Sequence, residues 1–273
     1  MKSHLKSIGR ISMAMLLLFV LSSHELFLKS DSHFLKRGQP TVLYLFNGTF
    51  DSSENAITTD RITGARITGP EYEFLPDSSD YYEKGKATYL RLTPGKSGTY
   101  AAGISTLPRM IELNAADFKE YLDHEGLDHV ISDRKKKGLS DQAAREKYSK
   151  HVKAILQVDQ KRTDHFSTEF GYPIEFIPLK NPYELKVGDM ASFKLMVNGK
   201  PLADQGVHIS SRSDGVDPFA KEIPGRTNEK GEVSFEITET GQWYVAAIHM
   251  IESSEENVDY ESNWATLTFE IGH

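Results

Sequence analysis

Short apolar runs separated by turn residues dominate both ends of this chain, and they restrict it to β architectures. Runs of four to eight apolar residues bounded by Gly, Pro, Asn and Asp are typical of strands in a sandwich. Asn47-Gly48 and Asn198-Gly199 are tight-turn signals beside such runs. The spacing therefore predicts a mainly β protein with two β-sandwich domains. The runs are residues 25–28, 41–46, 65–67, 87–92, 98–104, 109–113, 190–197, 207–211, 232–237, 243–249 and 265–271.

A different periodicity lies between the two strand-rich parts. Phe118, Tyr121 and Leu122 follow helical spacing, with Asn114 as N-cap and Gly126 as a stop. Ser140 can cap a second helix that carries one apolar stripe. We therefore expect a short helical insert over residues 114–157, packed on the first sandwich. The stripe consists of Ala144, Tyr148, Val152, Ile155 and Leu156.

The N-terminus has the three parts of a secretory signal peptide. Basic residues lead into an apolar core at 11–21, which is followed by the small residues Ser22 and Ser23. A run of this length is too short to span a bilayer about 30 Å thick. We expect export, cleavage, and a periplasmic or secreted protein that is not integral to the membrane. The expected organisation is a signal peptide at 1–23, an N-terminal β-sandwich at 24–113, the insert at 114–157, a connection at 158–182 and a C-terminal β-sandwich at 183–273.

Composition and missing motifs exclude several classes of function. The net charge of −7 disfavours nucleic acid as a partner, because phosphate binding needs concentrated positive charge. The absence of cysteine excludes disulfides, thiol chemistry and a lipoprotein anchor. There is no P-loop, nucleophile elbow or dinucleotide fingerprint, and His124 and His129 are five residues apart rather than the four of a zincin helix. The sequence thus favours a binding protein over an enzyme, without an organic cofactor.

His24 is the first candidate metal ligand because it lies at the predicted cleavage site. After cleavage behind Ser23, its α-amine and imidazole can chelate one ion. After cleavage behind Ser22, an amine, a deprotonated amide and the imidazole can bind a square-planar ion. Nitrogen donors suit Ni²⁺, Cu²⁺ and Zn²⁺.

His249 and His33 are the two further candidate metal ligands. His249 ends the apolar run 243–249, and strand alternation places it on the face of Trp243 and Val245. If that face is the core, His249 points inward at one end of a sandwich. His33 follows the first predicted strand closely.

Several motifs together resemble a known family. His24-Glu25-Leu26-Phe27-Leu28-Lys29 follows the predicted signal peptide and is followed by Gly38-Gln39-Pro40. This pattern resembles a widespread bacterial domain of unknown function, whose members are often labelled periplasmic nickel- or cobalt-uptake components, like the M subunit of nickel transport complexes. The resemblance implies a second domain of immunoglobulin-like or transthyretin-like type, and histidines at positions 24 and 249. Further matching segments are 47–50, 120–127, 145–150, 175–182 and 241–249.

Three functions follow as hypotheses. The first is a soluble periplasmic protein that binds Ni²⁺ or Co²⁺, with Cu²⁺ as the alternative, through His24, His249 and His33, for uptake or delivery. The second is a non-metal module of the cell envelope that docks a partner protein, peptide or glycan through sheet edges and aromatics. The third is a copper enzyme with a histidine brace at His24. The candidate aromatics are Tyr81, Tyr82 and Trp264.

Overall fold

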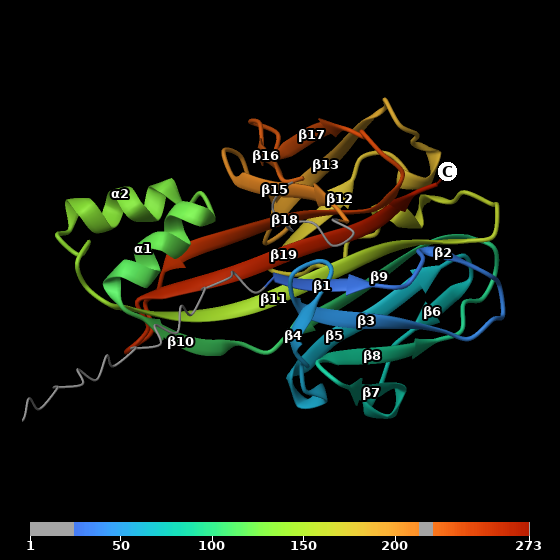
Figure 1. Ribbon diagram of the computed structural model, residues 1–273, viewed down its shortest axis with the longest axis horizontal. Helices are drawn as coiled ribbons and strands as arrows, with labels where there is room; N and C mark the ends of the chain where they lie inside the picture. The colour runs from blue at the N-terminus through green and yellow to red at the C-terminus, as the bar shows by residue number, and fades with distance from the viewer. Residues whose placement is uncertain (1–24, 213–220, 273) are drawn as a thin grey trace, which may run out of the picture.

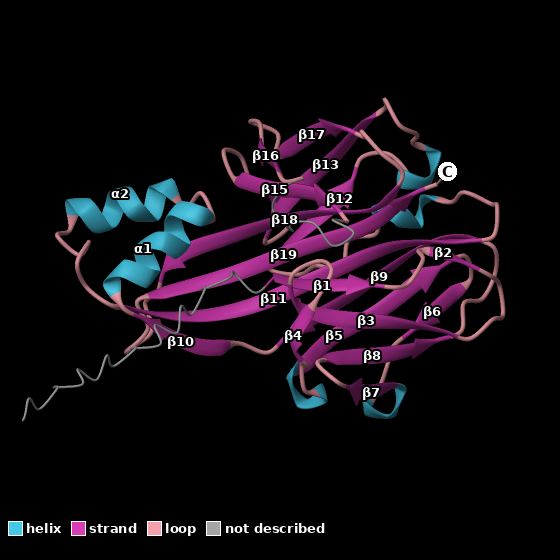
Figure 2. Cartoon of the chain, in the orientation of Figure 1, coloured by secondary structure: helices cyan, strands magenta, loops and turns pink. Residues whose placement is uncertain are grey.

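Three β-sheets stacked as layers form the body of the protein (Figure 1). The computed structural model describes residues 25–212 and 221–272. The predicted signal peptide and His24 therefore lie outside the described residues. The predicted strands are present, several further strands were not predicted, and the mainly β, sandwich-type fold is confirmed (Figure 2). Within these ranges, no helix is long and apolar enough to cross a membrane.

A ten-stranded sheet lies in the middle and runs the length of the molecule (Figure 1). Its order is β16 (Ile223–Arg226), β15 (Gly206–Ser211), β18 (Gly241–Glu252), β19 (Tyr260–Ile271), β11 (Ala144–Val158), β9 (Gly98–Thr106), β5 (Ile62–Gly69) and β6 (Tyr72–Phe74). β2 (Phe34–Leu35) and β10 (Arg109–Leu113) also pair with β11.

The two outer sheets each cover part of this central sheet. The five-stranded sheet has the order β1 (Glu25–Lys29), β3 (Thr41–Gly48), β8 (Ala87–Leu92), β7 (Tyr81–Lys84), with β4 (Ser53–Asn55) on β3. The four-stranded sheet contains β12 (Ile174–Pro178), β13 (Met190–Val197), β14 (Lys200–Pro201) and β17 (Glu232–Glu236). Short 3₁₀ turns lie at Thr59–Arg61, Ser78–Asp80, Asp164–Ser167 and Pro182–Glu184.

Two main apolar cores result, one under each outer sheet. Leu28, Leu45 and Leu90 of the five-stranded sheet form one core, and Phe176 and Phe193 of the four-stranded sheet belong to the other. Because successive strand residues point to opposite faces, Ile155 and Leu156 of β11 enter different cores. The two predicted sandwiches therefore share one continuous sheet.

The predicted second helix is wrong, because residues 144–158 form the long strand β11. Every residue from Lys150 to Val158 is buried, since both faces of this strand are covered. Polar residues are buried among the apolar ones here, namely Lys150, His151, Lys153 and Gln157, and they hide the alternation that distinguishes a strand from a helix. β11 pairs in parallel with β19 over residues 146–154.

The first predicted helix is confirmed as α1 (Ala115–His124), with the Asn114 side chain accepting from Asp117 N–H. A helix that the sequence did not predict, α2 (Asp128–Lys136), follows it. Figure 1 shows both helices over the ends of β18 and β19 that extend past the outer sheets. Phe118 and Leu122 pack there against Ile248, Met250 and Trp264, so the expected packing on the first sandwich is also wrong.

Candidate functional site

A cluster of acidic and histidine side chains around one buried carboxylate lies where α1 ends, beside the start of β1. We call Glu25, His124, Glu125, His208 and Glu222 the acid–histidine cluster. Glu125 is its centre, with a side chain only 1% exposed. His124 Nδ1 lies 3.0 Å from Glu125 Oε1, and His208 Nε2 lies 3.4 Å from Glu125 Oε2. One buried carboxylate thus contacts two imidazoles.

Contacts with carboxylates raise the pKa values of both imidazoles. Burial alone would lower the pKa of His208, but hydrogen bonds and negative charge from Glu125 and Glu222 outweigh it and raise the pKa to about 10. His208 Nδ1 lies 2.5 Å from Glu222 Oε1. The hydrogen bond to Glu125 also raises the pKa of His124, against the effect of burial. The two rings stack with their centroids 5.7 Å apart.

Glu25, the first residue of β1, adds a third carboxyl group to the cluster. Burial, followed by the negative charge of Glu125, raises the pKa of Glu25 to about 8. Its Oε2 atom is buried and has no hydrogen-bond partner among the described residues. Buried polar atoms without partners are rare and costly in folded proteins. Glu25 therefore holds its proton at neutral pH and keeps one oxygen without a partner among the described residues.

Lys150 of β11 is a buried amine whose positive charge acts on Glu25. Burial lowers the pKa of Lys150 to about 8, although the charge of Glu25 opposes this. Its Nζ donates to Asn47 Oδ1 at 3.0 Å and lies 5.0 Å from the ring centroid of Trp264. Trp264 in turn stacks on Tyr121 of α1, whose hydroxyl donates to the buried Glu146. Perturbed titratable groups concentrated in one place are typical of functional sites.

His249 and His33 lie apart from this cluster. β15 pairs with β18 so that His208 is opposite Ala246, and His249 is three residues further along β18. An odd offset places His249 on the opposite face of the sheet from Ala246 and His208. There, burial and the neighbouring charge of His129 lower the pKa of His249.

His33 is fully buried at the other end of β19. Its Nε2 lies 3.1 Å from Thr268 Oγ1, and burial lowers its pKa although Glu270 opposes this. His249 is paired with Asn263, five residues before Thr268, a separation of roughly 17 Å along an extended strand. Metal–nitrogen bonds are only about 2.1 Å long, so His33 and His249 do not share an ion.

The described ranges contain no group of three or more His, Asp or Glu side chains arranged to hold a metal ion. The acid–histidine cluster nevertheless has imidazole nitrogen and carboxylate oxygen, the donors that divalent transition metals take from proteins without cysteine. Sequence reasoning missed His208, because nothing local in the sequence indicates that β15 brings it to the end of α1. The one local signal was the adjacent pair His124-Glu125 before Gly126.

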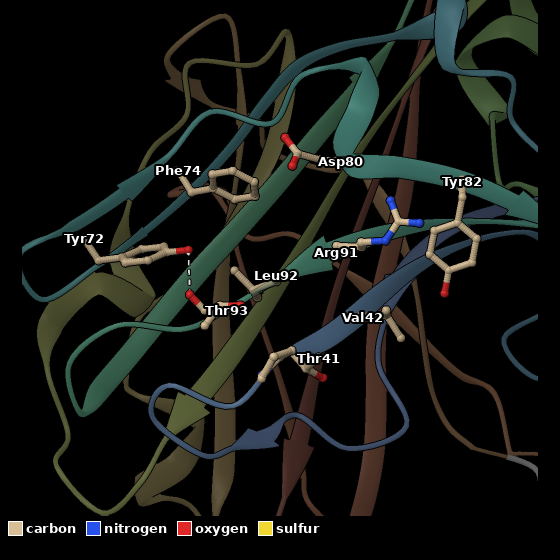
Figure 3. Close-up of a pocket in the computed structure, with 10 residues that line it drawn as sticks. Thr41, Val42, Tyr72, Phe74, Asp80, Tyr82, Arg91, Leu92 and Thr93 are labelled. Carbon is tan, nitrogen blue, oxygen red and sulfur yellow. Dashed lines mark hydrogen bonds between the residues drawn. The ribbon is translucent and has the colours of Figure 1, made fainter.

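A second candidate site is a cavity of about 750 Å³ between the edges of the five-stranded and ten-stranded sheets (Figure 3). Tyr82 stacks on Tyr89 with centroids 5.0 Å apart, and the guanidinium of Arg91 lies 4.5 Å from the centre of the Tyr82 ring. Figure 3 shows the Arg91 side chain between Asp80 and Tyr82, with Tyr72 and Phe74 from β6 on another wall. Of the predicted docking aromatics, Tyr82 lines this cavity, whereas Tyr81 and Trp264 are buried in cores.

Comparisons with known proteins identify a family for this chain but no activity. The profile of a family described as a domain of unknown function, DUF4198, matches residues 21–251. No curated protein matches the chain in sequence. Among solved structures, similarity is found to the D0–D1 domain of intimin, with 12% identity over 90% of this chain and 97% of that one, at a TM-score of 0.20.

Two further solved structures show the same weak similarity. The adhesin FdeC of Escherichia coli is 14% identical, with 92% of this chain and 65% of that chain covered, at a TM-score of 0.21. Latent PorU from Porphyromonas gingivalis is 12% identical, with 91% and 20% covered, at a TM-score of 0.20. The chain therefore spans just under two thirds of FdeC and a fifth of PorU. No functional argument rests on similarities of this size.

Proposed function

Since the chain belongs to the DUF4198 family of domains of unknown function, no activity follows from its family, and we propose that it is a cell-envelope binding protein for a divalent transition-metal ion. Ni²⁺ and Co²⁺ are the first candidates and Cu²⁺ is the alternative. The ion is the ligand that the protein carries, and the acid–histidine cluster provides part of its site.

One observation carries this proposal: the buried Oε2 atom of Glu25, which lies near Glu125 and has no hydrogen-bond partner in the part of the chain that the structure describes. A carboxyl group with a pKa near 8 holds a proton at neutral pH, because burial and the negative charge of Glu125 leave its charged form without full compensation. A divalent cation supplies that compensation and displaces the proton. Metal binding of this kind releases protons, and its affinity rises with pH.

His24 directly precedes Glu25 in the sequence. We propose that cleavage of the signal peptide leaves an α-amine at or next to His24, which completes the donor set begun by the cluster. We propose His124 and Glu125 as the further metal ligands. His208 is not a ligand in this proposal, because it is held as a cation between Glu125 and Glu222. In this arrangement His208 orients Glu125 rather than binding the ion.

Calorimetry on exported protein, with its N-terminus verified, tests the proposal. We expect heat with Ni²⁺, Co²⁺ or Cu²⁺, and proton release that differs between buffers of different ionisation enthalpy. His24→Ala and Glu125→Gln should weaken binding by about tenfold or more, as loss of a ligand or of its support does. His249→Ala, on the other face of the sheet, is the matched control and should bind as wild type. No heat with any ion, or unchanged affinity in His24→Ala, would refute the proposal.

The stacked Tyr82, Tyr89 and Arg91 favour a second candidate function, docking of an envelope glycan or peptide in the cavity of Figure 3. Partly exposed aromatic rings beside a guanidinium group are suited to such ligands. Pull-down from envelope extracts without metal should retain a partner with wild type and lose it with Tyr82→Ala. Leu107→Ala, an exposed apolar residue elsewhere, is the control. Equal retention by both variants would exclude this cavity as the docking site.

A further inference from the structure

A separate cavity of about 380 Å³ lies beside β11, between the end of β3 and the start of β10. Its volume is within the range of small-molecule sites. Polar side chains dominate its wall, and three of them are cationic. The lining residues are Asn47, Asn55, Ala56, Ile57, Thr58, Arg61, Arg109, Tyr148 and Lys150.

Positive charge is concentrated at this cavity, which we call the cationic cavity. Arg61, Arg109 and Lys150 line it, and no lining residue in the described ranges is acidic. The whole chain carries a net charge of −7, so the sign of the charge at this cavity is opposite to that of the chain as a whole. A local field of one sign inside a cleft attracts ligands of the opposite sign.

Arg61 is incompletely satisfied within the protein. One terminal nitrogen donates to Leu107 O at 3.3 Å, but Nε is buried without a hydrogen-bond partner among the described residues. Burial, followed by repulsion from Arg109, lowers the pKa of Arg61. Both guanidinium groups thus line a cavity whose described lining has no acidic residue, although Tyr148 and Asp60 attract Arg61. A bound anion would stabilise this arrangement.

We propose that the cationic cavity binds a small oxyanion, either a phosphate or a multiply charged carboxylate. The planar forks of Arg61 and Arg109 offer paired N–H donors of the kind that match such groups. Asn55, Thr58 and Tyr148 add neutral donors around the wall. This site is independent of the proposed metal site, although Lys150 lies close enough to both for the charges of Glu25 and Arg61 to act on it.

Titration calorimetry on metal-free full-length protein at low ionic strength tests the cationic cavity. The two probes are inorganic phosphate and citrate, which separate the inorganic from the organic source of the oxyanion. We expect saturable binding of at least one probe that weakens as salt is raised. Arg61→Gln and Arg109→Gln should each lower the affinity about tenfold or more, the size expected for a lost charge-assisted hydrogen bond.

Arg66→Gln is the matched control, because it removes the same charge from β5, where Arg66 pairs with Glu73. It should leave the affinity within about twofold of wild type. Arg109 is exposed, so Arg109→Gln keeps the test valid even if Arg61→Gln fails to fold. The proposal is overturned if neither probe binds wild type, or if Arg66→Gln weakens binding as much as Arg109→Gln does.

Discussion

Lys153 of β11 and Glu175 of β12 form an ion pair of 2.9 Å between side chains that are only 1% and 4% exposed. Lys153 also donates to Thr168 O, and Glu175 accepts from the N–H groups of Phe170 and Gly171. The pair links the central sheet to the four-stranded sheet through one buried contact. Removal of one partner leaves the other charge buried and uncompensated.

The first prediction concerns this pair. Lys153→Met and Glu175→Gln should each lower the free energy of unfolding by about 3–5 kcal/mol, as loss of one buried partner does. Urea denaturation measures the change. The double variant Lys153→Met/Glu175→Leu should be less destabilised than the sum of the single variants, because no lone charge remains. Strict additivity would show that the two charges do not depend on each other.

The second prediction concerns pH. The pKa of Glu25 is raised from 4.5 to about 8, so the folded chain holds one more proton than the unfolded chain between those values. The free energy of unfolding must therefore fall as pH rises through this window. His208, with its pKa raised from 6.5 to about 10, adds to the fall from pH 6.5 upward, whereas Lys150, with its pKa lowered from 10.5 to about 8, opposes the fall above pH 8.

Glu25→Gln should reduce the fall in the free energy of unfolding between pH 4.5 and about 8, and it should keep the part of the fall that is due to His208. Urea denaturation at several pH values within the window measures both slopes. The exposed Glu83→Gln is the control and should keep the wild-type profile. A wild-type slope retained in Glu25→Gln would mean that another group takes up the proton.

The third prediction tests the core under the four-stranded sheet. Phe193 is 1% exposed and contacts the rings of Phe235 and Phe269. Phe193→Ala should cost about 3–5 kcal/mol, because it leaves a cavity that these neighbours cannot fill. Met190→Ala, on the same strand but 55% exposed, should change stability by less than about 0.5 kcal/mol. Similar losses in both variants would contradict the assigned core.

The fourth prediction concerns the close approach of Gly69 to Tyr100. A Cβ atom at residue 69 would lie 2.4 Å from the Tyr100 ring, which is fully buried and fixed by a hydrogen bond to Lys96 O. Gly69→Ala should therefore destabilise the protein by about 1–3 kcal/mol in thermal or urea unfolding. Gly206→Ala meets its nearest atom at an ordinary 3.6 Å and should be tolerated far better. Equal stability of the two variants would contradict this packing.

Sequence patterns predict a strand well when one of its faces is buried and the other is less so. Ala191, Phe193 and Leu195 of β13 alternate with less buried residues, and this strand was predicted with its bounds. β11 was misassigned because both of its faces are covered, which removes the alternation that distinguishes a strand from a helix.

The candidate sites depend on contacts that local patterns do not encode. His208 joins Glu125 only through the register of β15 against β18 and the position of α1, and Arg61 meets Lys150 only through packing around β11. Turn and apolar signals specify elements, whereas the pairing of distant strands decides which side chains meet. The role of His24 remains a prediction that biochemical work on the processed chain can test.

The position of β19 between β18 and β11 has a consequence for how the protein is made. β11 emerges during translation more than a hundred residues before its parallel neighbour, so its edge stays unpaired until residues 260–271 exist. Long-range parallel pairing of this kind is slow, and an open strand edge invites aggregation while it waits. We therefore expect the unpaired edge of β11 to be prone to aggregation until residues 260–271 are made, and neither half should be obtainable as a stable fragment.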